Sequence, residues 1–117
     1  MNKDFELFKK TFTAYQKKFG LMGYKVYFKH ESLEGAYAKI NVYEDAHTVT
    51  VRLESNPTKD DGEFWDVKTF AKHEALHLLL ARLTEAAVTR YTSEENIIQA
   101  GEEIVYKLEG LLDGKSP

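Results

Sequence analysis

Residues 70–80 of the chain read FAKHEALHLLL. Apolar and helix-forming residues fill this stretch and the segment around it, which predicts one long helix ending near Leu83. His73 and His77 are four residues apart, so they lie one turn apart on the same face of that helix. Glu74 follows the first histidine and is rotated away from that face.

The remaining segments place this helix in a small domain. Aromatic residues at steps of three and four predict a first helix over residues 3–19, which Gly20 ends. Period-two alternation predicts strands over residues 24–29, 36–43 and 48–53, before a polar loop over residues 55–63. A loop near residues 84–93 leads to a last helix over residues 93–112. Thr92 and Glu95 form a capping-box pattern at its start.

The order of these elements predicts an α+β fold in a single domain spanning residues 1–117. The links between the strands are short, and residues 44–46 suit a hairpin. We therefore expect a three-stranded antiparallel meander with helices packed on one face.

Composition narrows the possible functions. The net charge is -3 and the chain has no cysteine, so any metal ligand must be His, Asp or Glu. The lysines of the first helix are diluted by acidic residues, and we expect no nucleic-acid partner. The N-terminal segment lacks the apolar stretch of a secretion signal, and no apolar run is long enough for a membrane span. We expect a cytoplasmic protein without a membrane partner, and the oligomeric state stays open.

His73, Glu74 and His77 together match the HExxH arrangement of zinc hydrolases. The two imidazoles would bind one Zn²⁺, which lowers the pKa of a bound water to about 7. Glu74 lies beside that ion and would take the proton as general base. The alternative is a pair of surface or hydrogen-bonded core histidines with no metal.

A third ligand is expected to come from a carboxylate, because no histidine follows His77. Stepping 100° per residue along the last helix places Glu102 at the edge of its apolar face, in mid-helix. Glu102 is therefore the preferred ligand, with Glu95 and then Glu94 as alternatives, whereas Glu103 points to solvent. The residues of the expected buried face are Ile97, Ile98, Ile104, Val105, Leu108 and Leu112.

HEALH followed by a helical glutamate resembles the gluzincin type of zinc metallopeptidase. The segments FAKHEALHLLL and AGEEIVYKLE look like those of small zincin-like metallopeptidases often encoded by phages and bacteria. The resemblance implies His73, His77 and Glu102 as zinc ligands and Glu74 as general base. It also implies a sheet edge beside the cleft that pairs with an extended peptide.

The chain departs from that family in three respects. Tyr106 stands where larger gluzincins often carry an acidic residue four positions after the ligand glutamate. No histidine or tyrosine is clearly placed as an oxyanion stabiliser. The candidates for that role are Tyr37, Tyr91 and Tyr106, although packing or surface roles suit each of them. We also expect no second subdomain of the kind that usually walls the peptide cleft.

The sequence therefore predicts a zinc-dependent metallopeptidase that hydrolyses peptide bonds with a zinc-bound water and Glu74. A peptide or protein is the expected substrate. The alternative function is a non-catalytic zinc-binding module that regulates or binds another protein. An open ligand position on the ion would favour catalysis, and a closed one would favour a structural role.

Overall fold

The structure is a computed structural model that describes residues 3–58, 62–89 and 92–113. Its three helices and three strands form the predicted α+β fold, and each predicted strand boundary lies within two residues of the observed one. The elements are α1 (Lys3–Lys18), β1 (Lys25–Glu31), β2 (Ala38–Tyr43), a 3-10 turn η1 (Glu44–Ala46), β3 (Thr48–Glu54), α2 (Val67–Val88) and α3 (Glu94–Asp113). Among the described residues, no helix is long and apolar enough to cross a membrane.

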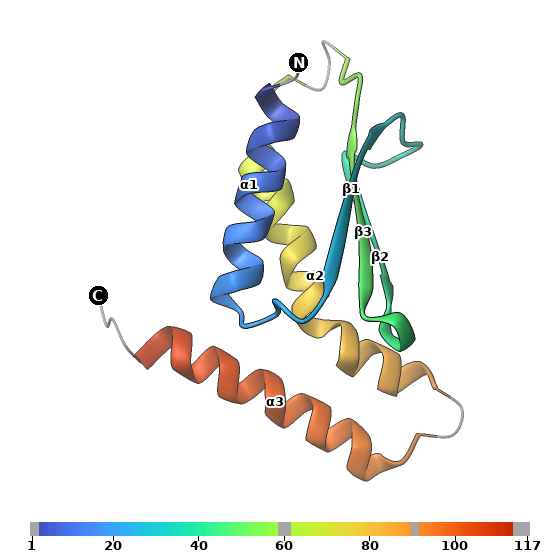
Figure 1. Ribbon diagram of the computed structural model, residues 1–117, viewed down its shortest axis with the longest axis vertical. Helices are drawn as coiled ribbons and strands as arrows, with labels where there is room; N and C mark the ends of the chain where they lie inside the picture. Colours follow the sequence, from blue (N-terminus) through green and yellow to red (C-terminus); the bar gives the residue numbers. More distant parts are fainter. Residues whose placement is uncertain (1–2, 59–61, 90–91, 114–117) are drawn as a thin grey trace.

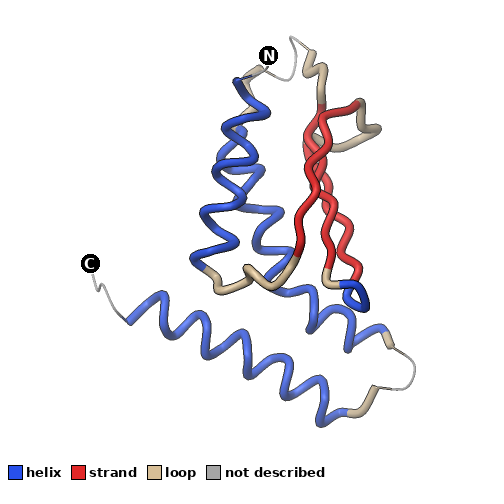
Figure 2. Tube along the Cα trace, viewed as in Figure 1, coloured by secondary structure: helices blue, strands red, loops and turns tan. Residues whose placement is uncertain are grey.

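Helices α1 and α2 pack together on one side of the sheet, and α3 crosses below them (Figures 1 and 2). The core lies between these helices and the strands. Phe8 and Phe12 of α1 are fully buried, and both rings meet the ring of Phe28 edge-on, at centroid distances of 6.4 and 5.7 Å. Gly20 follows α1 with a φ of 73°, a left-handed conformation that glycine adopts without strain, as the sequence predicts.

The sheet is mixed, so the predicted antiparallel meander is wrong. The strand order is β1-β3-β2, with β3 parallel to β1 and antiparallel to β2. The physical reason lies in β3, where Val49, Val51 and Leu53 are all fully buried. A central strand has neighbours on both sides, whereas a meander would have left this most apolar strand at an edge. Strand β2 becomes an edge strand instead.

The β2–β3 connection is the predicted short hairpin. Its three residues form η1, and His47 follows with a φ of 50° in the left-handed region. His47 also lies against the ring of Tyr24, with 5.3 Å between the ring centroids. The turn is therefore braced by the residue that precedes β1.

Helix α2 contains the histidines, as predicted, and is longer than the sequence suggested. Asp66 caps its start, accepting a hydrogen bond from the backbone nitrogen of Thr69 at 3.2 Å. The helix continues to Val88, beyond the expected end at Leu83, so the predicted loop near residues 84–93 begins too early. Alanine-rich sequence after Leu83 sustains the helix because alanine has the highest helix propensity.

Helix α3 buries only part of the expected face, because Ile97 and Ile104 are half-buried and the buried side is rotated toward Ala100. Ala100 is 1% exposed, whereas Ile98, Val105 and Leu108 are 57%, 48% and 39% exposed. Because Ala100 is small, it lets α3 approach its neighbours closely along this side. Leu112 belonged to the same expected face, but its side chain lies outside the described residues.

The start of α3 and its link to α2 also differ from expectation. Ser93 Oγ, rather than Thr92, accepts the capping hydrogen bond, from Asn96 N at 3.1 Å. Glu103 is exposed, as expected, and its Oε1 also lies 2.9 Å from Arg82 Nε of α2. This exposed ion pair holds the same side of α3 against α2.

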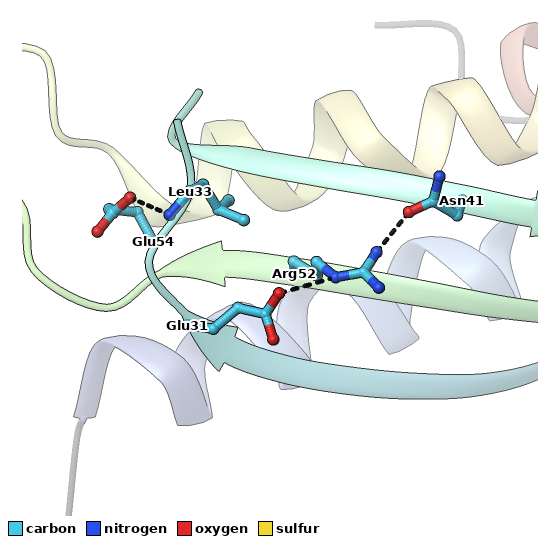
Figure 3. A network of polar contacts seen from close by, with 5 residues as sticks. All are labelled: Glu31, Leu33, Asn41, Arg52 and Glu54. Carbon is cyan, nitrogen blue, oxygen red and sulfur yellow. Dashed lines mark hydrogen bonds and ion pairs between the residues drawn. The ribbon is translucent and has the colours of Figure 1, made fainter. Parts of the chain in front are cut away.

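Polar contacts hold the link between β1 and β2 where it crosses the end of β3 (Figure 3). Glu54, at the end of β3, accepts from the backbone nitrogen of Leu33 at 2.7 Å and from that of Asn56 at 3.0 Å. One carboxylate oxygen serves each donor. Arg52 binds the carboxylate of Glu31 at 3.1 Å and the side-chain oxygen of Asn41, tying β1 and β2 to the central strand.

Replacing Glu54 by glutamine tests this arrangement. Glutamine keeps one acceptor oxygen and turns an NH₂ group toward the second backbone nitrogen, which loses its partner. We expect the free energy of unfolding to fall by about 1–3 kcal/mol in urea titrations. The exposed neighbour Glu34 gives a matched control, since Glu34→Gln makes the same charge change. Equal stability of the two variants would contradict the assigned role of Glu54.

Candidate functional site

His73 and His77 lie side by side on the exposed face of α2. Their Nε2 atoms are 3.2 Å apart, and their ring centroids are 4.7 Å apart with the ring planes at 81°. Both side chains are exposed, so they are not core histidines. The pair therefore presents two ring nitrogens together at the surface of the helix.

The spacing of these two nitrogens fits a shared zinc ion. Ligand nitrogens at 2.0–2.1 Å from a tetrahedral zinc are separated by roughly 3.3 Å, close to the observed 3.2 Å. The same spacing suits a hydrogen bond between a protonated and an unprotonated ring nitrogen. The two Nε2 atoms are therefore close enough to bind the same ion.

Glu74 is the buried member of the motif. Its residue is only 6% exposed and shares the buried side of α2 with Ala71, Ala75 and Leu78. Burial raises the pKa of the Glu74 carboxyl, and positive charge on His73 and His77 acts in the opposite direction. No hydrogen bond reaches this carboxylate from the described residues. A carboxylate with a raised pKa and free oxygens is suited to accept a proton.

The three motif residues line one hollow of about 460 Å³ between α2 and β2. Ala38, Lys39 and Ile40 line it consecutively, although side chains of a strand alternate between the two faces. The hollow therefore follows the free edge of β2.

A smaller hollow of about 290 Å³ adjoins the first beside Tyr37, and His73 and Glu74 line this one too. The ring of Tyr37 stacks on Phe70 with 5.0 Å between the centroids. Of the three tyrosines considered for oxyanion stabilisation, Tyr37 is thus near the motif. Tyr106 is 69% exposed on α3, and Tyr91 lies outside the described residues.

The structure does not bring the expected third ligand to the histidines. Glu94, Glu95 and Glu102 are all exposed on α3. Within residues 3–58, 62–89 and 92–113, no three His, Asp or Glu side chains are close enough to hold one metal ion. The assignment of Glu102 stays a prediction.

Two carboxylates that sequence reasoning did not select also line the hollow, Glu44 and Glu85. Glu85 shares its helix face with His77, Ala81 and Val88, so helical periodicity was a usable signal for it. No sequence signal placed Glu44 there, because its position depends on how the β2–β3 turn packs against α2.

Glu44 is held by Tyr24, whose hydroxyl donates to Glu44 Oε2 at 2.7 Å. Burial raises the pKa of the Tyr24 hydroxyl, and the hydrogen bond to Glu44 adds to the effect. Tyr24 therefore remains a neutral donor at physiological pH. Glu44 keeps its second oxygen for other contacts.

Comparison with family models, with curated proteins and with solved structures gave no significant match for this chain.

The burial of Glu74 predicts a measurable cost in the zinc-free protein. The Glu74 carboxyl has a raised pKa in the folded state, so it contributes to stability while it is protonated. This contribution is fully present below the pKa that the same carboxyl has in the unfolded chain, and it is lost as pH rises through the folded-state pKa. Glu74→Gln removes the charge at nearly constant volume. We expect it to raise the melting temperature of the chelator-treated chain at pH 7 by a few degrees.

The control for this comparison is Glu63→Gln, at an exposed position outside the hollow. It should leave the melting temperature nearly unchanged. A lower melting temperature for Glu74→Gln than for the control would show that the Glu74 carboxylate stabilises the metal-free fold.

Proposed function

We propose that this protein is a zinc-dependent metallopeptidase. The observation that carries the proposal is the position of two histidine Nε2 atoms 3.2 Å apart, next to a buried glutamate. That glutamate has no hydrogen-bond partner among the described residues. All three side chains open into a hollow that runs along a free strand edge. Hydrolysis of an extended peptide would use each of these parts, together with a third zinc ligand.

His73 and His77 would hold the ion through their Nε2 atoms. When bound, zinc supplies Lewis acidity that polarises the scissile carbonyl and lowers the pKa of water. Glu74 accepts one proton from the attacking water as its oxygen bonds to the carbonyl carbon. Glu74 then delivers that proton to the amine nitrogen as the C–N bond breaks, which returns the carboxylate to its starting state.

The free edge of β2 would bind the substrate backbone. Strand β2 pairs with β3 on one side only, so backbone donors and acceptors on its other side are available to an added strand. The hollow follows this edge past the histidines. A peptide paired with β2 would pass directly in front of the two rings.

Glu102 is the proposed third ligand. It is exposed on α3, and the apolar residues one turn away, Ile98 and Tyr106, are exposed on the same side at 57% and 69%. An apolar stripe around a carboxylate suits a face that packs against another surface. Glu95 and Glu94 are the alternative ligands on the same helix.

Exchange of Glu74 for glutamine tests the mechanism. The variant should keep zinc, because both histidines remain, and should lose proton transfer. We expect kcat/KM on a pool of random internally quenched decapeptides to fall by about 10²–10⁴-fold. Glu63→Gln serves again as the charge-matched control. Full activity in a zinc-loaded Glu74→Gln protein would exclude Glu74 as the base.

Zinc affinity tests the third ligand. We expect Glu102→Ala to weaken zinc binding by about 10-fold or more in a competition titration with a chromophoric chelator. Glu95→Ala and Glu94→Ala should bind as the parent protein does. Unchanged affinity in Glu102→Ala with loss in one of the other two would move the ligand to that residue.

A non-catalytic zinc-binding module that regulates or binds another protein is the alternative. The observation in its favour is the exposed apolar side of α3, which includes Ile98, Val105 and Tyr106. A structural ion would make folding depend on zinc, so a chelator would unfold the chain. For the peptidase, a chelator abolishes hydrolysis while the helical circular dichroism is retained.

A further inference from the structure

The hollow extends well past the histidines toward the end of β2. Beyond His77 it is lined by Ala81, Thr84 and Glu85 of α2, and on the opposite side by Val42 and then Glu44. Helix α2 contacts both β2 and η1 over this stretch. A substrate long enough to follow the strand edge would therefore meet Glu44 and Glu85 at the far end.

Glu44 is fixed in place rather than loosely exposed. Its residue is half-buried, and Tyr24 donates to its Oε2 at 2.7 Å. Tyr24 is itself packed against the ring of His47. The carboxylate is thus pre-positioned, with Oε1 left to accept a bond from a ligand, and little entropy is lost when a partner binds.

The cations nearby do not neutralise this end of the hollow. Arg82 is one turn before Glu85, but its Nε pairs with Glu103 at 2.9 Å. Lys39 is the one lysine or arginine among the described residues that line the hollow, whereas three carboxylates line it, those of Glu44, Glu74 and Glu85. Neither Glu44 nor Glu85 forms an ion pair within the described part of the chain.

Glu74 gives a second, independent observation on the same hollow. Glu74 is a polar side chain more than nine-tenths buried that lines it without a hydrogen-bond partner among the described residues. No polar side-chain atom of the described residues is both fully buried and unpaired, so the Glu74 carboxylate is open to a molecule bound in the hollow. The free edge of β2 adds unpaired backbone groups along the same path.

We propose that Glu44 and Glu85 form a subsite for a lysine or arginine side chain of an extended peptide bound along β2. This inference rests on the proposed peptidase function and adds the substrate class to it. Ammonium and guanidinium groups supply the donors that two carboxylates lack, and such charge-assisted hydrogen bonds are strong. The aliphatic stem of the basic residue would lie along Val42 and Ala81.

Helix geometry gives the position of the basic residue in the substrate. His77 and Glu85 are eight residues apart, which is about 12 Å along the axis of α2. An extended peptide rises about 3.3 Å per residue, so this distance corresponds to three or four residues. With the reach of a long side chain included, the basic residue lies about two to four residues from the scissile bond.

The experiment uses the full-length zinc-loaded protein and internally quenched decapeptide pools. Each pool carries lysine, norleucine or glutamate at one fixed position, and mass spectrometry locates the cleaved bond. Lysine pools should be cleaved with a kcat/KM about tenfold higher than norleucine pools, through a lower KM, when lysine lies two to four residues from the bond. The Glu44→Gln/Glu85→Gln double variant should bring that ratio near one. The Glu34→Gln/Glu63→Gln double variant, with the same charge change outside the hollow, should keep the full preference.

Binding of the same fixed-position peptides to zinc-loaded Glu74→Gln, measured by fluorescence anisotropy, separates the two proposals. Cleavage with equal rates for lysine and norleucine pools would overturn the subsite and leave the peptidase intact. Lysine-selective binding without any cleavage by the parent protein would support the subsite and overturn the peptidase. An equal preference in the two double variants would also overturn the subsite, and the absence of both binding and cleavage would overturn both proposals.

Discussion

The packing of one face of α2 against α1 and the sheet is the constraint on which the site depends. Ala71, Ala75 and Leu78 are at most 1% exposed, and the two alanines let the helix lie close to its neighbours. Once this face is fixed, the rotation of 100° per residue sets the direction of every other side chain. His73 and His77 must point outward, and Glu74 falls between the buried face and the hollow.

This constraint also explains why the motif was readable in the sequence. Periodicity within one helix is a local property, so the helix and the shared face of the histidines follow from their spacing. The same reasoning anticipated α1 and the β2–β3 hairpin. It left open whether the histidines are buried, and they are exposed because their apolar neighbours lie on other sides of the helix.

The failures of prediction concern contacts between distant segments. The position of β1 beside β3 depends on burying Val49, Val51 and Leu53 in a central strand, which no local pattern specifies. For α3, large apolar residues suggested one buried face, but Ile98, Val105 and Leu108 of that face are exposed and Ala100 beside it is buried. A small residue can determine helix packing by what it permits, and a hydrophobicity pattern does not register this effect.

The sheet order has a direct consequence for chemistry. With β3 in the centre, β2 becomes the edge strand that flanks the hollow, and its turn brings Glu44 opposite α2. A meander would have placed β2 in the centre of the sheet, paired on both sides, and β2 would then have had no free edge for a peptide. The arrangement that stabilises the most apolar strand is thus the one that leaves a strand edge beside the histidines. Stability and the proposed substrate path have the same structural origin.

The central claim is that His73 and His77 together bind one zinc ion. Elemental analysis of the purified protein after zinc loading and dialysis tests it most directly, with His73→Ala and His77→Ala variants measured alongside. The account predicts about one zinc per chain in the parent protein and little in either variant. A parent protein that retains no zinc, or variants that retain as much as the parent, would contradict it.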